Sequence, residues 1–423
     1  MGKRSRKTNR SFVLVSILVG VCLLLSASTP ILAQNQPKEI KIGILYCMTG
    51  PLASIARLCV NGHEMAAEEI NAKGGIKSLG GAKIKFVVGD TESKPQVAMS
   101  AAEKLITKDN VVALLGPYSS GIAFPSTQIS EKYKCPNILS GPVANQITER
   151  GFKYIFRTVY NATTNARVAL DFVKWVGDKT GQRPKRVAIL HEDTLFGQST
   201  AKSWKEMLPK YGLELVAELP YQKTTQDLST TIMKLKAAKP DLVLQVSYTN
   251  DAILVTRTMY DLDFNCMGRI PSGGGHIDPA FAKAVGKLAD DLIVNHHYHP
   301  SFKGPKNKNQ IANEKYKKKY GIDMDDYSGP AYDATWVLAD ALERAGSMDR
   351  QKVRDAIAAT DINWNNSPVL RPFQYKFDAT GQAPATGVFT QFRDGKMQVI
   401  WPEEYASAKV VWPMRTWKER GLR

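Results

Sequence analysis

The sequence is poor in cysteine and has only one long apolar run. It has five cysteines in 423 residues, and Cys22 lies within the apolar run near the N-terminus. The other four, Cys47, Cys59, Cys135 and Cys266, are too few to form a disulfide scaffold in so long a chain. Cys47 and Cys59 are the one pair positioned for a disulfide, and buried free thiols are the alternative. No apolar run beyond the N-terminus approaches the roughly 20 residues of a membrane span, so we expect a soluble mature protein.

Motifs for nucleotide binding and for nucleophilic catalysis are missing. There is no P-loop and no dinucleotide fingerprint, and the glycine run SGGGHID (272–278) lacks the spacing of a phosphate cradle. In GPYSSG (116–121), neither serine has a glycine at both second positions, so the stretch is not a nucleophile elbow. We therefore expect a protein that is not an enzyme and that holds no cofactor.

The histidines of HHYH (296–299) are the only candidates for a metal site. His297 and His299 share one face of a predicted strand, a spacing compatible with a metal ion. No carboxylate or cysteine nearby in sequence completes a zinc site. We expect no bound metal, and a hydrolase or metal-dependent enzyme that uses these histidines remains an alternative.

The N-terminus has the parts of a secretory signal peptide. A basic stub precedes the apolar run, and small residues lead to Ile31-Leu32-Ala33, so cleavage after Ala33 is predicted to remove residues 1–33. An uncleaved membrane anchor is the alternative. Five basic residues lie in this leader, and without them the formal charge of +17 becomes +12. The lysines of residues 303–321 are typical of a solvated helix face, and no motif indicates a nucleic-acid partner.

Strand-like and helix-like segments alternate along the rest of the chain. Apolar, β-branched runs separated by segments of helical periodicity indicate an α/β fold with parallel sheets covered by helices on both faces. Two such series, broken near residue 160, predict two doubly wound lobes. The predicted strands are 39–46, 83–90, 111–117, 136–141, 186–192, 213–220, 241–248 and 292–299, and β-like pieces end the chain. The predicted helices include 53–72, 95–108, 307–319, 328–346 and 349–360.

The clearest binding signal is LLGPYSSG (114–121). In parallel sheets, ligands lie beyond the carboxyl ends of strands, where helix N-termini offer free N–H groups and a positive dipole end. Here a strand is followed by a turn and then by Ser119 and Ser120, which could donate hydrogen bonds to a carboxylate. Simple capping of the helix by these serines is the alternative.

Several motifs resemble the periplasmic leucine/isoleucine/valine-binding proteins, the amino-acid-type solute receptors of ABC importers. The resemblance rests on TGPLA, EEINAKGGI, LGPYSSG, ERGFKYIFRT, VAILHEDTLFGQ and YDATWVLADALERAG, which occur in family order over nearly the whole mature chain. It implies the type I periplasmic binding fold, in which two lobes joined by crossing segments close around a small molecule. It also implies no catalysis, because such a receptor hands its ligand to a membrane permease.

The resemblance implies ligand contacts from several loops of the first lobe. The counterparts of the serines bind the ligand carboxylate, and the next loop meets the amino-acid head group through its backbone. A residue on the first helix stands where relatives place a larger side chain over the apolar part of the ligand. The matching positions are Ile55, Ser119, Ser120, Val143 and Ala144.

On the second lobe, the resemblance implies two aromatic contacts and a turn. Phe196 matches an aromatic residue that closes over the ligand, and Tyr248 matches a tyrosine at a strand end. The turn RIPSGGG aligns Ser272, Gly273 and Gly274 with the place where amino-acid-binding members have an acid that pairs with the ligand ammonium.

The absence of an acid from this turn leads to a hypothesis about the ligand. A buried ammonium without a counter-charge is destabilised by several kcal/mol, and neither Asp251 nor Asp278 occupies the matching position. We hypothesise a ligand without an α-ammonium, such as an aromatic acid, a keto acid or an amide. The glycines would leave room for a bulkier or flatter group. A branched-chain amino acid is the alternative.

The predicted organisation follows from the family fold. We expect a monomeric periplasmic protein that binds a small molecule and docks on an ABC transporter permease, and a ligand-sensing receptor module of the same fold is the alternative. Hinge crossings are expected near 158–161, 298–302 and 363–372. The predicted units are a signal peptide (1–33), lobe 1 (38–158 and 300–365), lobe 2 (159–299 and 366–395) and a C-terminal extension (396–423).

Overall fold

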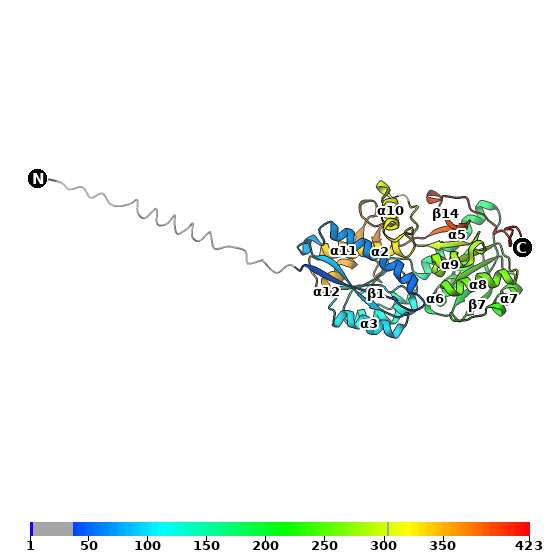
Figure 1. Ribbon diagram of the computed structural model, residues 1–423, viewed down its shortest axis with the longest axis horizontal. Coiled ribbons are helices and arrows are strands. Elements are labelled where there is room, and N and C mark those ends of the chain that lie inside the picture. The colour runs from blue at the N-terminus through cyan, green and yellow to red at the C-terminus, as the bar shows by residue number, and fades with distance from the viewer. Residues whose placement is uncertain (3–36, 303) are drawn as a thin grey trace.

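Two lobes, each built on a parallel sheet, make up the part of the chain that the structure describes (Figure 1). This structure is a computed structural model, and it describes residues 1–2, 37–302 and 304–423. The predicted signal peptide therefore lies outside the described residues except for its first two. No helix of the described ranges is long and apolar enough to cross a membrane.

The first lobe is an αβα sandwich around a five-stranded parallel sheet in the order β2-β1-β3-β4-β5. Its central strands are buried because helices cover both faces, with α2 and α11 packed together on one side and α3 and α4 on the other (Figure 1). The elements are β1 (Glu39–Tyr46), α2 (Ala53–Ala72), β2 (Lys83–Asp90), α3 (Pro95–Thr107), β3 (Ala113–Leu115), α4 (Ser120–Lys132), β4 (Asn137–Leu139), β5 (Ile155–Arg157), α10 (Lys308–Tyr320), α11 (Ser328–Ala345) and α12 (Arg350–Ala358).

The second lobe repeats this plan around a four-stranded parallel sheet in the order β7-β6-β8-β9. Alternate residues of β6 face opposite helix layers, so Ile189 packs in the cluster of Trp204 and Leu190 in that of Ile232. The elements are α5 (Ala162–Thr180), β6 (Arg186–Glu192), α6 (Leu195–Met207), β7 (Glu214–Tyr221), α7 (Ser229–Ala238), β8 (Leu242–Val246), α8 (Thr249–Asp261), β9 (Gly268–Pro271) and α9 (Pro279–Val285).

A separate antiparallel sheet completes the second lobe, and here the structure differs from the all-parallel prediction. β10 (Ile293–His296) pairs antiparallel with β13 (Val388–Arg393), which pairs antiparallel with β14 (Lys396–Trp401). The stacked rings of Phe172 and Phe389, 4.4 Å apart, join this sheet to α5. The C-terminal segments therefore return to the second lobe and supply the partners that β10 needs.

The last residues are an integral part of the second lobe rather than an extension. Trp417 is buried, and its indole N–H donates a 2.8 Å hydrogen bond to the Phe264 carbonyl. Arg415 forms an ion pair with the buried carboxylate of Asp291. The C-terminus accordingly lies on the second lobe (Figure 1).

The third crossing between the lobes lies later in the chain than predicted. The backbone N–H of Leu370 and the guanidinium of Arg371 bond to Asp333 on α11, so this stretch packs on the first lobe. The N–H of Arg157 donates to the carbonyl of Gly381 at 2.8 Å. The chain thus reaches the second lobe only between residues 381 and 388. A short ladder of β11 (Asp361–Ile362) and β12 (Tyr375–Lys376) precedes this crossing.

Long periodic segments have the predicted bounds, whereas short strands are shorter than predicted. The structure reproduces 39–46, 83–90 and 186–192 as strands and 53–72 as a helix. The predicted strand 111–117 is only three residues long, because Gly116 turns the chain with φ at +93°. The short 3-10 helices are η1 (Lys77–Leu79), η2 (Asn145–Ile147), η3 (Leu208–Tyr211), η4 (Gly274–His276), η5 (Gly286–Ala289), η6 (Pro305–Asn307), η7 (Trp364–Asn366) and η8 (Glu403–Tyr405).

Candidate ligand site between the lobes

A pocket lies between the lobes at the carboxyl ends of the first-lobe strands. The space between its walls, counted together with the open solvent at its mouth, is about 490 Å³. Its walls come from both lobes and from two of the crossing segments. The lining residues are Cys59, Tyr118, Ser120, Ser140, Gly141, Pro142, Val143, Tyr160, Phe196, Tyr248, Ser272, Gly274, Ile277, His297, Asp326 and Tyr327.

The turn after β3 positions the N-terminus of α4 at this pocket. Gly116 is required there, because a Cβ at this position would lie 2.5 Å from the carbonyl oxygen of Leu45. Ser119 holds the N-cap position of α4, yet its side chain makes no capping hydrogen bond. Its hydroxyl instead lies 2.9 Å from the Tyr248 hydroxyl of the other lobe. Capping alone therefore does not describe Ser119.

Ser120 organises the neighbouring loop. Its Oγ accepts hydrogen bonds from the backbone N–H groups of Val143 and Ala144, each at 3.2 Å. Because Oγ is the acceptor in both, the hydroxyl hydrogen stays available to a ligand. These backbone N–H groups are consequently bound to protein, which differs from the predicted contact between this loop and a ligand head group.

Six of the ten predicted site residues line the pocket. They are Ser120, Val143, Phe196, Tyr248, Ser272 and Gly274. The other four, Ile55, Ser119, Ala144 and Gly273, are buried and do not belong to the lining. Their role as ligand contacts stays a prediction.

Sequence reasoning missed the lining residues that come from distant loops. Tyr118 lies inside the LGPYSSG motif, so its neighbourhood gave a usable signal. His297 stood out only as a metal candidate, and Asp326 and Tyr327 just before α11 carried no local signal. The sequence places Ser140, Gly141 and Pro142 directly before the predicted contact loop. The remaining lining residues are of types that also fill the core, so the sequence does not distinguish them; they are Cys59, Tyr160 and Ile277.

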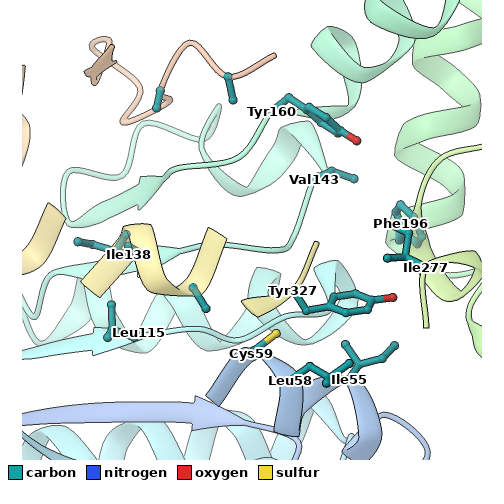
Figure 2. Packing of buried hydrophobic residues seen from close by; sticks show 14 of the residues in the cluster. Ile55, Leu58, Cys59, Leu115, Ile138, Val143, Tyr160, Phe196, Ile277 and Tyr327 are labelled. Carbon is teal, nitrogen blue, oxygen red and sulfur yellow. The ribbon is translucent and has the colours of Figure 1, made fainter. Parts of the chain in front are cut away.

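Aromatic rings form much of the pocket wall. Five lining residues have phenyl or phenol rings, namely Tyr118, Tyr160, Phe196, Tyr248 and Tyr327. Tyr118 and Tyr327 meet edge to face with ring centres 5.4 Å apart, and Phe196 and Tyr248 lie 5.5 Å apart. Figure 2 shows the side chains of Tyr160, Phe196 and Tyr327 around one common space. Such a wall suits a flat apolar group.

Hydrogen bonds across the cleft hold the lobes together. Besides the contact between Ser119 and Tyr248, the Tyr327 hydroxyl donates to the carbonyl of Gly274 at 2.6 Å. At the rim, the Asn145 backbone N–H donates to Ser199 Oγ at 3.1 Å. These bonds exist only while the lobes are close, so the structure represents a closed arrangement.

The glycine turn RIPSGGG forms part of the pocket wall and adds no extra volume to the pocket. A Cβ on Gly274 would lie 2.5 Å from the Ser247 carbonyl oxygen, and one on Gly275 would lie 2.1 Å from the Thr249 nitrogen. The glycines therefore let the turn pack against the start of α8. Ser272 is bonded to the side-chain amide of Asn165. The expected extra room for a bulky ligand group is not found at this turn.

The acids considered as substitutes lie outside the lining, but another acid lies within it. Asp251 accepts from the Tyr221 hydroxyl and the Tyr248 N–H, and Asp278 accepts from Thr249 Oγ1. Burial raises the pKa of Asp251 to about 7. Asp326, by contrast, lines the pocket. The pocket lining therefore contains a carboxylate, although the glycine turn has none.

Cys47 and Cys59 form no disulfide, and both histidines of the metal hypothesis have protein partners. Cys47 and Cys59 are buried free thiols, and burial raises the pKa of both. His299 Nδ1 contacts Ser301 Oγ at 2.8 Å, whereas His297 faces Asp326. Within the described ranges, no group of three or more His, Cys, Asp or Glu side chains could hold a metal ion.

A two-lobed α/β fold with a closed pocket between the lobes defines a class of solute-binding proteins. The sequence profile of the periplasmic binding protein family matches residues 39–396. The chain is 31% identical to a Leu/Ile/Val-binding protein homolog 7 of Brucella suis biovar 1 (strain 1330), over 94% of this chain and 98% of that one. The protein therefore belongs to the periplasmic binding protein family.

Solved structures show the same fold. The substrate-binding protein LivJ of the branched-chain amino-acid transporter of Streptococcus pneumoniae, in complex with isoleucine, aligns with a TM-score of 0.75 at 22% identity, covering 89% of this chain and 100% of that one. An ABC-transporter solute-binding protein of R. palustris, in complex with benzoate, aligns with a TM-score of 0.74 at 19% identity, covering 86% and 95%.

Proposed function

We propose that this protein is the extracytoplasmic solute-binding component of an ABC importer and that it binds a small aromatic carboxylate between its lobes. The observation that carries the proposal is the pocket wall, where five aromatic rings surround a space next to the N-terminus of α4. Binding without catalysis, delivery to a membrane permease, a monomeric state and removal of residues 1–33 belong to the same proposal.

The carboxylate end of the ligand is assigned to Ser120. This hydroxyl lies in the first turn of a 13-residue helix, where the dipole favours negative charge. The lining contains no lysine or arginine, so neutral donors and this helix terminus would hold the carboxylate. The proposed ligand contacts are the six predicted residues that line the pocket, with Ser119, Ala144, Ile55 and Gly273 in support.

The aromatic part of the ligand is assigned to the rings. Phe196 and Tyr248 would cover it from the second lobe, and Tyr118 and Tyr327 from the first. The R. palustris protein of the same fold was solved with benzoate, which supports a ligand of this class. A closed pocket of this kind excludes water and lets flat rings stack.

A branched-chain amino acid is the second candidate, favoured by one observation. Asp326 in the lining supplies a carboxylate that could pair with an ammonium. Both oxygens of Asp326 already accept hydrogen bonds, one from the Tyr298 N–H and one from His297. The relative from Brucella suis carries the name of a Leu/Ile/Val-binding homolog, so this candidate needs a direct test.

Calorimetric titration of the purified mature chain separates the two candidates. We expect benzoate or another aromatic acid to bind with a dissociation constant in the micromolar range or below, and leucine, valine and phenylalanine to bind far more weakly. Micromolar binding of any of these three amino acids would refute the proposed ligand class. A thermal-shift screen over the same compounds gives an independent readout, because a ligand that binds only the folded state raises Tm.

A further inference from the structure

A half-buried imidazole in the pocket wall, that of His297, has one nitrogen without a hydrogen-bond partner among the described residues. His297 Nδ1 lies 3.0 Å from Asp326 Oδ2, and its ring stacks on Tyr160 with centres 3.9 Å apart and planes 22° apart. Its Nε2 is buried and has no hydrogen-bond partner among the described residues. Two neighbours thus hold the ring in place at the pocket while one polar atom stays unsatisfied.

The hydrogen-bond partner of Nδ1 determines whether Nε2 donates or accepts a hydrogen bond. Asp326 is an acceptor, since its other oxygen receives the Tyr298 N–H at 2.5 Å. Nδ1 therefore donates the hydrogen of this contact, and in the tautomer that this contact selects Nε2 presents a lone pair. An unpaired buried acceptor is destabilising, and a donor on the ligand would remove that penalty.

We propose that His297, oriented by Asp326, accepts a hydrogen bond from a hydroxyl on the ring of the aromatic ligand. This inference rests on the proposed function and names its substrate class more narrowly, as hydroxylated aromatic acids. Ser120 would bind the ligand carboxylate, and His297 would accept a hydrogen bond from the ligand hydroxyl.

A hydroxyl fits this position better than an ammonium does. The imidazole offers a single lone pair, which matches the single hydrogen of a hydroxyl, whereas an ammonium has three. The carboxylate behind the imidazole is engaged on both oxygens. A site built around such an acceptor discriminates strongly against analogues that lack the donor.

The test compares matched ligand pairs rather than single affinities. The full mature protein is titrated with benzoate and with the 2-, 3- and 4-hydroxybenzoates and their methoxybenzoate counterparts, which have similar size but no donor. We expect at least one hydroxybenzoate to bind at least tenfold more tightly than the methoxybenzoate of the same position. In His297→Phe, which keeps a ring to stack on Tyr160, this ratio should fall to about twofold or less.

Three further variants keep the test decisive. His299→Phe changes a histidine two residues away that does not line the pocket, so it should keep the wild-type ratio. His297→Leu removes the same acceptor and replaces His297→Phe should the latter not fold, as judged by circular dichroism. His297→Gln restores an acceptor and should recover part of the ratio.

The outcomes separate this inference from the proposed function. If benzoate binds but the hydroxyl preference is absent in the wild type, or survives in His297→Phe, the inference is overturned and the proposed function stands. Equal weakening of hydroxy- and methoxybenzoates in His297→Phe also overturns it. If no aromatic acid binds while leucine does, the proposed function fails and the inference fails with it.

Discussion

The two walls of the pocket differ in chemistry. The first lobe contributes hydroxyl, thiol and carboxylate groups through Ser120, Ser140, Cys59 and Asp326, in addition to its two tyrosines. The second lobe contributes mainly rings and apolar surface, including Phe196, Tyr248 and Ile277. The difference suggests a division of labour, in which the first lobe orients the polar end of a ligand and the second lobe covers its apolar part as the cleft closes.

The lobes also differ in how the chain completes them. The first lobe takes all strands of its parallel sheet from residues 39–157, while its helices α10, α11 and α12 and the short β11–β12 ladder come from later in the chain. The second lobe borrows β13, β14 and the segment around Trp417 from the end of the chain. Its stability therefore depends on contacts that form only after the whole chain has been made.

The largest expected effect tests this dependence. Replacing Trp417 with alanine removes a buried indole and its hydrogen bond to the Phe264 carbonyl, and should lower the free energy of unfolding by about 3–5 kcal/mol. Hydrogen exchange should show lost protection in α7 and α8 rather than in the first lobe. Met233→Ala on α7, where the side chain is 52% exposed, is the control. Equal loss in both lobes would contradict the comparison.

The second prediction concerns the polar wall. Ser120→Ala removes a hydroxyl that holds two backbone N–H groups and faces the proposed carboxylate. A hydrogen bond to a charged group contributes about 1.5–3 kcal/mol, so calorimetry should show affinity for the aromatic acid weakened about 10- to 100-fold. Ser126→Ala, on the same helix but outside the lining, should bind as the wild type does. An unchanged affinity in Ser120→Ala would remove Ser120 from the site.

The third prediction tests the covering wall. Tyr248→Phe keeps the ring but removes the hydroxyl that meets Ser119 across the cleft at 2.9 Å. This bond belongs to the closed form, and a neutral hydrogen bond contributes about 0.5–1.5 kcal/mol, so affinity should fall about 3- to 10-fold. Tyr211→Phe breaks a bond to Asp171 within one lobe and serves as the control. A larger loss than in Ser120→Ala would reverse the proposed division of labour.

The smallest expected effect is a pH dependence confined to the second lobe. Burial raises the folded-state pKa of Asp251 to about 7 from an ordinary value of 3.8. The folded state therefore retains this proton better, and the resulting stabilisation is lost as pH rises from about 4 through 7. Thermal melts should show wild-type Tm falling relative to Asp251→Asn over this range, by a few degrees. A constant difference in Tm would contradict the raised pKa.

The helix and strand pattern was predictable because it depends on local periodicity. The bounds of β1, α2, β2 and β6 follow from apolar spacing and turn residues that lie within each segment. The turn between β3 and α4 was likewise recognisable, since a strand end, glycine and two serines stand together in LLGPYSSG. Six predicted site residues belong to such motifs and line the pocket.

Other features depended on contacts between residues far apart in the chain. The antiparallel partner of β10 lies about 90 residues later, and the crossing after residue 381 is set by Asp333 and Arg157. No local pattern encodes such pairings, because many apolar strands of the chain could have paired with the edge of β10.

The sequence by itself determined the alternating segments, the two-lobed plan and the serine turn at the cleft, since each arises from neighbouring residues. Only the tertiary structure decided that Asp326 and His297, 29 positions apart, meet beside Tyr160 in the pocket. The hydrogen bond between these two side chains and their partial removal from water arise only once the lobes have folded. The acid missing from the glycine turn was visible in the sequence, whereas the acid present in the pocket was not.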